Sequence, residues 1–472
     1  MQTPPSLIVI IRVSTKHTLS IGLTAFVLNN CQFIYILSFP SSQASEENTH
    51  FRPVGRQNST TGIQLVDDDD DETTMVEDTT SSSSKLSAAS SPSIPLISLA
   101  PLLSTSLSAS KQETAQALLS AFRHSGFLYL TEYFTLIPPT LLKNVFTQSA
   151  YFFALSLATK TALAWTTPRA NRGYTRMGRE KTSAGLSAAE VAVQRLGEGE
   201  DMKESFEIGR EGEAGCPNRW LDDDDSEEGK GEEEGAAATT FRATMLEFHD
   251  QCKEIHRVLM RGIALALGLD EGFFDGFTKR GDNTLRLLHY PAVPVGGFDE
   301  PATAAAGGGG GQKMKKKKVR AGAHTDYGSL TLLFQDARGG LQVDPEGVER
   351  WIDVVPIEGT IVVNAADLLM RWSNDLIKST RHRVVEPPLP PTPAAAAASQ
   401  EEEEEGGGGG DGSGESDASV DHPARYSIAY FCNPDFDGYI EAIPGTWETE
   451  QEKKYPGVNS GDYLAQRLSA TY

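Results

Sequence analysis

The sequence predicts a mainly β protein with flanking helices, built on a double-stranded β-helix, or jelly roll, with N-terminal helices packed on it. The first observation is a series of short strand-like runs after residue 283, separated by turn residues, which is typical of a double-sheet jelly roll. The second is a set of amphipathic helical patterns before residue 268. The strand-like runs are TLRLLHY, VRAGAHTD, SLTLLFQD, GLQVD, WIDVVP, TIVVNAAD, HRVVE and RYSIAYF.

The segment before these runs is expected to hold two short strands and three helices. The strands are expected at 96–99 and 127–130, and the helices at 111–126, 138–157 and 240–267. In the first helix, Ala115, Leu118 and Phe122 recur at the spacing of one helical face. Gly126 and Gly268 follow the first and third helices, so they are expected to end them.

Composition predicts one large domain with additions, although 472 residues could hold two or three domains. Four segments of acidic, Gly, Ser, Pro or Lys-rich sequence cannot bury a core: 40–94, 222–235, 301–318 and 387–421. We therefore expect a disordered or targeting-like tail over 1–94, an N-terminal helical region over 95–280 with an acidic loop at 222–235, and a jelly-roll core over 281–472 with loops at 301–318 and 387–421.

The net charge of −23 comes mostly from these segments and is typical of a solvated surface. The sequence pI of about 4.8 argues against binding to nucleic acid. The cysteines show no paired spacing, which favours a reducing compartment. They are Cys31, Cys216, Cys252 and Cys432.

The first 45 residues contain no acid, and residues 19–28 have the character of a signal-peptide core. A signal, a membrane anchor and an organellar presequence all stay open, although Asn29, Asn30 and Gln32 argue against an anchor. Membrane association is therefore not expected. The sequence makes no prediction of the oligomeric state.

Three residues form a candidate metal site: His324, Asp326 and His382. The His-X-Asp spacing would place His324 and Asp326 on one face of a strand, and His382 must then arrive from another strand. Two imidazoles and one carboxylate on one side of a metal leave its other positions open. That ligand set is typical of a non-haem Fe(II) oxygenase.

Arg425 and Ser427 form a candidate site for a carboxylate. They share a face of the alternating run RYSIAYF, and a guanidinium can donate two parallel hydrogen bonds to a carboxylate. Tyr290, in LRLLHYP, could add a hydrogen bond from its phenol.

Nine sequence blocks in family order between residues 95 and 434 carry a resemblance. They include FRHSGFLYL, KESFEIGRE, VRAGAHTDYGSLTLLFQD, NAADLLMRWSNDLIKSTRHRVVEP and RYSIAYFCNP. The chain resembles the 2-oxoglutarate- and Fe(II)-dependent dioxygenases of the isopenicillin-N-synthase-like group, in particular its fungal and bacterial members. The resemblance implies Fe(II) on His324, Asp326 and His382, with 2-oxoglutarate held by Arg425, Ser427 and Tyr290, and O2 as the oxidant.

The implied reaction is hydroxylation, desaturation or cyclisation of a small organic metabolite, with release of succinate and CO2. Because Fe(II) and 2-oxoglutarate are intracellular supplies, a cytoplasmic location is expected. Two alternatives stay open: an Fe(II) oxidase of the same group that does not use 2-oxoglutarate, and a jelly-roll binding protein without activity. Secondary metabolites, nucleobases, amino acids and gibberellin-like terpenoids are all candidate substrates.

Residues near the site carry further expectations. Asn364 and Asp367 are expected to shape a turn, and Ala366 would be strained if that turn needed a positive φ. His289 is expected to point away from the pocket if Tyr290 points into it. Four aromatic residues are expected to pack in the core rather than line the substrate pocket: Tyr327, Phe206, Phe334 and Phe431.

Overall fold

The computed structural model describes residues 94–179, 201–221, 232–294, 320–386 and 422–471, with two short strands nearer the N-terminus. The expected loops at 301–318 and 387–421, most of the loop at 222–235 and most of the tail lie outside the described residues. The chain divides into two units, Met1–Leu86 and Ser87–Tyr472. In the first unit, β1 (Thr24–Leu28) pairs antiparallel with β2 (Gln32–Ile36). No helix in the described part of the chain is long and apolar enough to cross a membrane.

The second unit is built on an eight-stranded sheet, here called the major sheet. Its strands, in spatial order, are β3 (Leu96–Ser98), β4 (Phe127–Thr131), β12 (Ile361–Ala365), β9 (Leu330–Gln335), β14 (Arg425–Cys432), β7 (Thr284–Tyr290), β6 (Glu204–Gly209) and β5 (Gly173–Thr175). The pairs are antiparallel except β3 with β4, which is parallel.

A four-stranded minor sheet completes the jelly roll. Its order is β11 (Ile352–Asp353), β10 (Leu341–Asp344), β13 (Arg381–Val384) and β8 (Ala321–His324), paired antiparallel. Residues from both sheets form one buried cluster, which includes Phe127, Tyr290, Val343 and Val384. The two sheets therefore face each other across a shared core, and the predicted jelly-roll architecture is confirmed.

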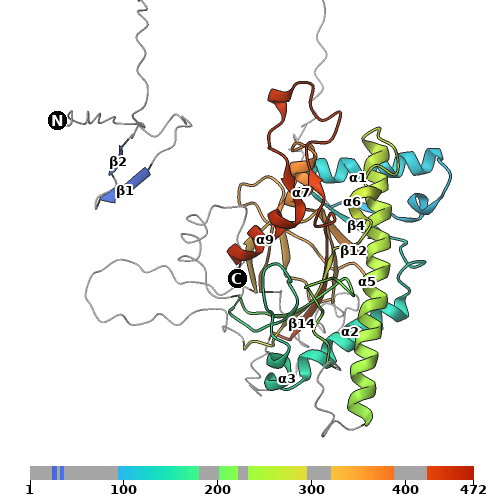
Figure 1. Cartoon of the computed structure of the whole chain (residues 1–472), viewed down its shortest axis with the longest axis vertical. Helices are drawn as coiled ribbons and strands as arrows, with labels where there is room; N and C mark the ends of the chain where they lie inside the picture. The colour runs from blue at the N-terminus through green and yellow to red at the C-terminus, as the bar shows by residue number, and fades with distance from the viewer. Residues whose placement is uncertain are drawn as a thin grey trace, which may run out of the picture. The chain divides into compact units, whose positions relative to one another are not determined.

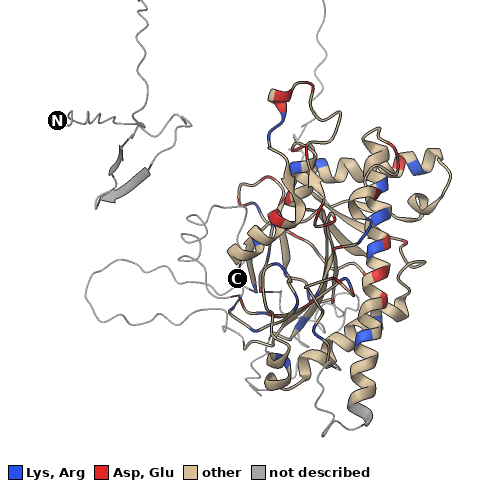
Figure 2. Ribbon diagram, in the orientation of Figure 1, with Lys and Arg blue, Asp and Glu red and all other residues tan. Residues whose placement is uncertain are grey.

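Helices cover the other face of the major sheet. The helices before β7 are α1 (Ala109–His124), α2 (Pro139–Ala154), α3 (Leu157–Ala162), α5 (Glu232–Ala266) and α6 (Asp275–Thr278). Two more follow later in the chain, α7 (Asp367–Trp372) and α9 (Ser460–Thr471), and α9 lines the cavity between the sheets instead. The long α5 packs against α1, α2 and β14 (Figure 1). Acidic and basic residues recur along α5 in Figure 2, whereas its Phe241, Phe248 and Ile255 are fully buried. The three predicted helices are confirmed.

Local sequence sets the helix boundaries. The side chain of Ser108 accepts a hydrogen bond from the backbone of Lys111 and so caps α1. Gly126 and Gly268 have φ values of 73° and 74°, which glycine adopts without steric cost, just after α1 and α5 end. The expectation that these two glycines end their helices is confirmed.

The two faces of β14 show how the fold places polar groups inside the barrel. Ile428 and Tyr430 point to the helices, and the ring of Tyr430 lies 5.1 Å from that of His249 in α5. Arg425, Ser427 and their alternate neighbours line a cavity between the two sheets. A period of two therefore puts a charged residue of a central strand inside the barrel.

Candidate metal centre and co-substrate site

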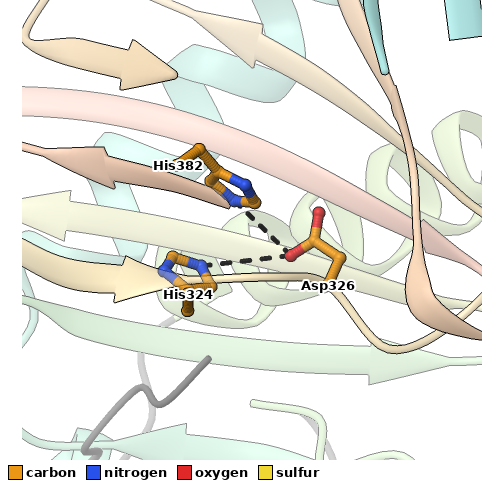
Figure 3. A group of neighbouring side chains, drawn as sticks. All are labelled: His324, Asp326 and His382. Carbon is orange, nitrogen blue, oxygen red and sulfur yellow. Dashed lines mark ion pairs between the residues drawn. The ribbon is translucent and has the colours of Figure 1, made fainter. Parts of the chain in front are cut away.

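His324, Asp326 and His382 lie together inside the barrel, as Figure 3 shows. One ligand atom from each residue lies within 4.8 Å of the others. The Nε2 atoms of His324 and His382 are 4.0 Å and 3.7 Å from Oδ1 of Asp326. The two imidazoles come from neighbouring strands, since His382 in β13 is directly opposite His324 in β8.

The expectation that His324 and Asp326 share a face of one strand was wrong. Strand β8 ends at His324, and Asp326 lies in the loop that follows. The carboxylate is directed at the histidines by its own hydrogen bonds instead. The backbone of this loop is fixed from α7, because Asp367 N donates to Asp326 O at 2.9 Å.

Hydrogen bonds orient both imidazoles. Nδ1 of His324 donates to the carbonyl of Gly322 at 2.7 Å, and Nδ1 of His382 donates to the carbonyl of Thr380 at 3.2 Å. Because a carbonyl can only accept, each Nδ1 carries the proton and each Nε2 keeps its lone pair. Such partners are the usual support of metal-binding histidines.

The second oxygen of Asp326 is held by two donors. Its Oδ2 accepts from Thr331 Oγ1 at 2.6 Å and from Asn364 Nδ2 at 2.8 Å. Asn364 is thus a strand residue that orients the carboxylate, and Asp367 is the first residue of α7, so the expected turn at these two residues was wrong. Ala366 has φ −118°, so this position needs no glycine.

The protonation states of His324 and Asp326 suit the binding of a metal cation. Burial, and then the neighbouring His382, lower the pKa of His324 to about 3. Burial alone would raise the pKa of Asp326, but His382, His324 and the hydrogen bonds from Thr331 and Asn364 lower it overall. At neutral pH the site therefore offers a free imidazole nitrogen and a carboxylate, which is the donor set that Fe(II) takes.

Arg425, Ser427 and Tyr290 lie together at another part of the same cavity. Arg425 Nη1 donates to Ser427 Oγ at 3.0 Å, and its guanidinium carbon lies 4.9 Å from the centre of the Tyr290 ring. The Arg425 side chain is buried, and among the described residues its Nε has no hydrogen-bond partner. A buried cation with an unused donor fits a carboxylate ligand.

The cavity joins the two sites and has a volume of about 140 Å³, room for about ten waters at roughly 10–15 Å³ each.

Tyr327 and Phe431 line the cavity, so the expectation that they pack in the core was wrong. Phe206 and Phe334 are buried in the core, as expected. His289 points to the other face of the sheet, where its Nδ1 lies 2.8 Å from Glu204 Oε1, as expected.

Sequence reasoning missed several residues of the cavity wall. Helix α9 contributes one side through Gly461, Leu464, Ala465, Leu468 and Thr471. Polar groups come from Asn171, Lys203 and Arg286. Of the described residues that line the cavity, Asp326 is the one acidic residue, whereas Arg169, Lys203, Arg286 and Arg425 are cationic. Lys203 is paired with Asp201 and Arg286 with Glu207, so the cavity presents charged hydrogen-bond donors rather than a large net positive charge.

Comparisons with known proteins agree with this geometry. Residues 285–434 match the 2OG-Fe(II) oxygenase superfamily, and residues 94–223 match the non-haem dioxygenase in morphine synthesis N-terminal family. The 2-oxoglutarate-dependent dioxygenase htyE of Aspergillus rugulosus is 30% identical over 72% of this chain and 88% of its own. Proline hydroxylase buaE of Petromyces alliaceus is 29% identical over 76% of this chain and 93% of its own.

A solved structure shows greater identity. It is a full-length Neurospora crassa protein in complex with alpha-KG and thymine, which is 47% identical, covers 80% of this chain and 97% of its own, and has a TM-score of 0.61. The chain belongs to the 2OG-Fe(II) oxygenase superfamily. It is a 2-oxoglutarate-dependent dioxygenase, an oxidoreductase that uses Fe(II), 2-oxoglutarate and O2.

Proposed function

We propose that His324, Asp326 and His382 hold the Fe(II), and that Arg425, Ser427 and Tyr290 hold the distal carboxylate of 2-oxoglutarate. The convergence of two Nε2 atoms and one carboxylate oxygen in a buried site supports the first assignment. The buried guanidinium of Arg425 beside the Ser427 hydroxyl supports the second. When bound, the metal and 2-oxoglutarate supply the oxidation of a C–H bond of the substrate.

The remaining residues prepare the site for this reaction. Thr331 and Asn364 fix the carboxylate of Asp326, and the Tyr290 ring supports the Arg425 guanidinium through a cation–π contact. The two sheets and α9 line the cavity, so a substrate bound there is partly removed from water.

The substrate that we propose is a pyrimidine base with a 5-methyl group, such as thymine, hydroxylated on that methyl group. The observation that carries this proposal is the 47% identity to the Neurospora crassa protein, which was solved with alpha-KG and thymine and also with alpha-KG and 5-formyluracil. These two ligands differ only in the oxidation state of the 5-substituent, which is the position that a dioxygenase would oxidise.

The cavity has the chemistry to bind such a ring. Phe431 offers an aromatic surface for stacking, and Arg286 lies over it with its guanidinium carbon 5.2 Å from the ring centre. Arg286 is held by Glu207, with Nε 2.8 Å from Oε1. Asn171 also lines the cavity, and its Oδ1 accepts from Trp165 Nε1 at 3.0 Å. A guanidinium and an amide are donors that suit the carbonyl oxygens of a pyrimidine.

Turnover of the full-length protein with Fe(II), 2-oxoglutarate and ascorbate tests the substrate. We expect thymine to give a product heavier by one oxygen atom, with one succinate formed for each product molecule. Uracil, which lacks the methyl group, and L-proline serve as comparison substrates. A chain that hydroxylates proline and leaves thymine unchanged would refute the pyrimidine proposal.

A second experiment tests the metal assignment. His382→Ala should abolish tight Fe(II) binding and turnover, whereas His124→Ala, at an exposed histidine of α1, should change neither. Succinate formation by His382→Ala at the wild-type rate would refute the assignment. The dependence of O2 uptake on added 2-oxoglutarate tests the use of this co-substrate directly.

A further inference from the structure

Helix α9 forms a wall of the cavity that the catalytic sheets do not provide. Leu464, Ala465 and Leu468 present an apolar surface to the same cavity that holds the three metal-ligating candidates. In Figure 1 the helix lies beside α7, near the C-terminus of the chain. The position of α9 therefore decides whether this side of the cavity is closed.

One carboxylate oxygen connects α9 to the loop that follows β8. Arg467 Nη1 in α9 lies 2.6 Å from Asp367 Oδ2 in α7. The same Oδ2 accepts a hydrogen bond from Thr325 Oγ1 at 3.0 Å. Thr325 stands between His324 and Asp326, so Asp367 contacts both the cavity wall and the loop of the metal site. We call Arg467, Asp367 and Thr325 the clasp.

Tyr327 extends this connection on the other side of Asp326. The Arg467 guanidinium carbon lies 4.3 Å from the centre of the Tyr327 ring, and Tyr327 Oη is 2.6 Å from Thr471 Oγ1 at the end of α9. Asp367 and Thr325 are buried, and the Arg467 side chain is 20% exposed. The ion pair is thus largely removed from solvent, where losing one partner has a large effect.

We propose that the clasp is a positioning device that couples the closed seating of α9 to the placement of the loop 324–327, so that oxidation of the 2-oxoglutarate co-substrate stays coupled to oxidation of the bound substrate. Asp367 acts through its neighbours and touches neither substrate nor metal. When the clasp is broken, α9 opens, water enters the cavity, and succinate and CO2 form without a matching amount of oxidised product. The second oxygen atom of O2 is then reduced to water by two electrons from ascorbate in the assay.

Hydrogen exchange and coupling measurements on the full-length protein test this proposal. The variants are Asp367→Asn, Arg467→Met, their combination, and Arg467→Lys, which keeps the charge but loses the planar stacking on Tyr327. The control is Arg257→Met, which removes an exposed ion pair with Glu254. We expect faster exchange in residues 460–471 and a severalfold lower ratio of product to succinate for Asp367→Asn and Arg467→Met. The control should match the wild type in both measurements. Arg467→Lys should give values between those of the wild type and Arg467→Met.

The double variant should be no worse than the poorer single variant, because both changes break the same contact. Should Arg467→Met fail to fold, Thr325→Val removes one hydrogen bond to the same carboxylate and is expected to shift both readouts in the same direction. Unchanged exchange in α9, or an unchanged ratio in a variant whose α9 has opened, would overturn the proposal. The ratio of product to succinate rests on the proposed function, whereas the exchange measurement needs no substrate. A failure of the clasp proposal can therefore be distinguished from a failure of the proposed function.

Discussion

The side-chain amide of Asn364 donates a hydrogen bond of 2.8 Å to Oδ2 of Asp326, and this contact joins the major sheet to the proposed metal site. Asn364 lies in β12, where its backbone pairs with Phe127 of β4 and Thr331 of β9. Thr331 donates to the same oxygen. Two adjacent strands therefore hold one carboxylate oxygen and leave Oδ1 directed at the histidines.

Asn364→Ala should weaken Fe(II) binding about 10- to 100-fold, because the carboxylate loses one of the two donors that orient it. An anaerobic Fe(II) titration measures this change. Asn218→Ala, which removes a buried amide bonded to Gly209 on another strand, is the control for general destabilisation. Equal iron affinities for Asn364→Ala and the wild type would show that Thr331 alone is sufficient.

Arg425→Ala should raise the Kd for 2-oxoglutarate roughly ten- to hundredfold, because hydrogen bonds to charged groups contribute about 1.5–3 kcal/mol. Arg425→Lys keeps the charge but loses the planar guanidinium, so its Kd for 2-oxoglutarate should lie between those of the wild type and Arg425→Ala. The Fe(II)–2-oxoglutarate charge-transfer absorption, followed in an anaerobic titration, gives these values. A Kd unchanged in Arg425→Ala would remove this residue from co-substrate binding.

The pKa of His256 predicts an acid-sensitive fold. Burial lowers this pKa to about 3, and the ring of His256 lies in α5 with Nε2 3.0 Å from Ser329 Oγ. In the unfolded chain the pKa is about 6.5. Between these values the unfolded chain binds a proton that the folded chain does not. The free energy of unfolding should therefore fall as the pH falls through this window, by up to about 1.4 kcal/mol per pH unit.

Urea unfolding of the metal-free protein at about pH 7 and about pH 5 measures this effect. His256→Gln, which cannot be protonated in this range, should be less stable at about pH 7 but lose less stability on acidification than the wild type. His324 is present in both proteins, so its own titration cancels in the comparison. Parallel pH profiles for the two proteins would contradict the prediction.

The sequence predicted the parts of this structure that depend on local patterns. Strand-like runs between turn residues located β7, β9 and β14, and residue type and spacing selected the three metal-ligating candidates. Strand β6 was missed because its six residues are all buried and two of them are Glu204 and Glu207. Those charges are tolerated only because Lys160 and Arg286, distant in sequence, pair with them at 3.0 Å and 2.8 Å.

Contacts between distant segments explain the other omissions. Helix α9 is short, and its place at the cavity depends on Arg467 meeting Asp367, 100 positions earlier in the chain. Asn364 was expected in a turn because asparagine is common there. Its role becomes visible only when β12 places it against Asp326. Patterns within one element cannot show such pairings.

Gly126→Ala should destabilise the fold more than Gly268→Ala, although both glycines follow a helix with nearly the same φ, 73° and 74°. Each substitution costs about 1–2 kcal/mol for the left-handed backbone. A Cβ at Gly126 would also lie 2.3 Å from Thr380 Oγ1 and 2.8 Å from Lys378 O, whereas at Gly268 nothing lies within 4 Å. Relieving that overlap should add about 1–3 kcal/mol.

The displaced segment leads into the proposed metal site, because the carbonyl of Thr380 accepts the hydrogen bond from His382 Nδ1. Gly126→Ala should therefore also weaken Fe(II) binding, whereas Gly268→Ala should leave it unchanged. Chemical denaturation and an anaerobic Fe(II) titration of the two variants check both parts. Equal losses of stability would mean that the turn before β13 moves freely, and a normal iron affinity in Gly126→Ala would mean that His382 is oriented independently of Thr380.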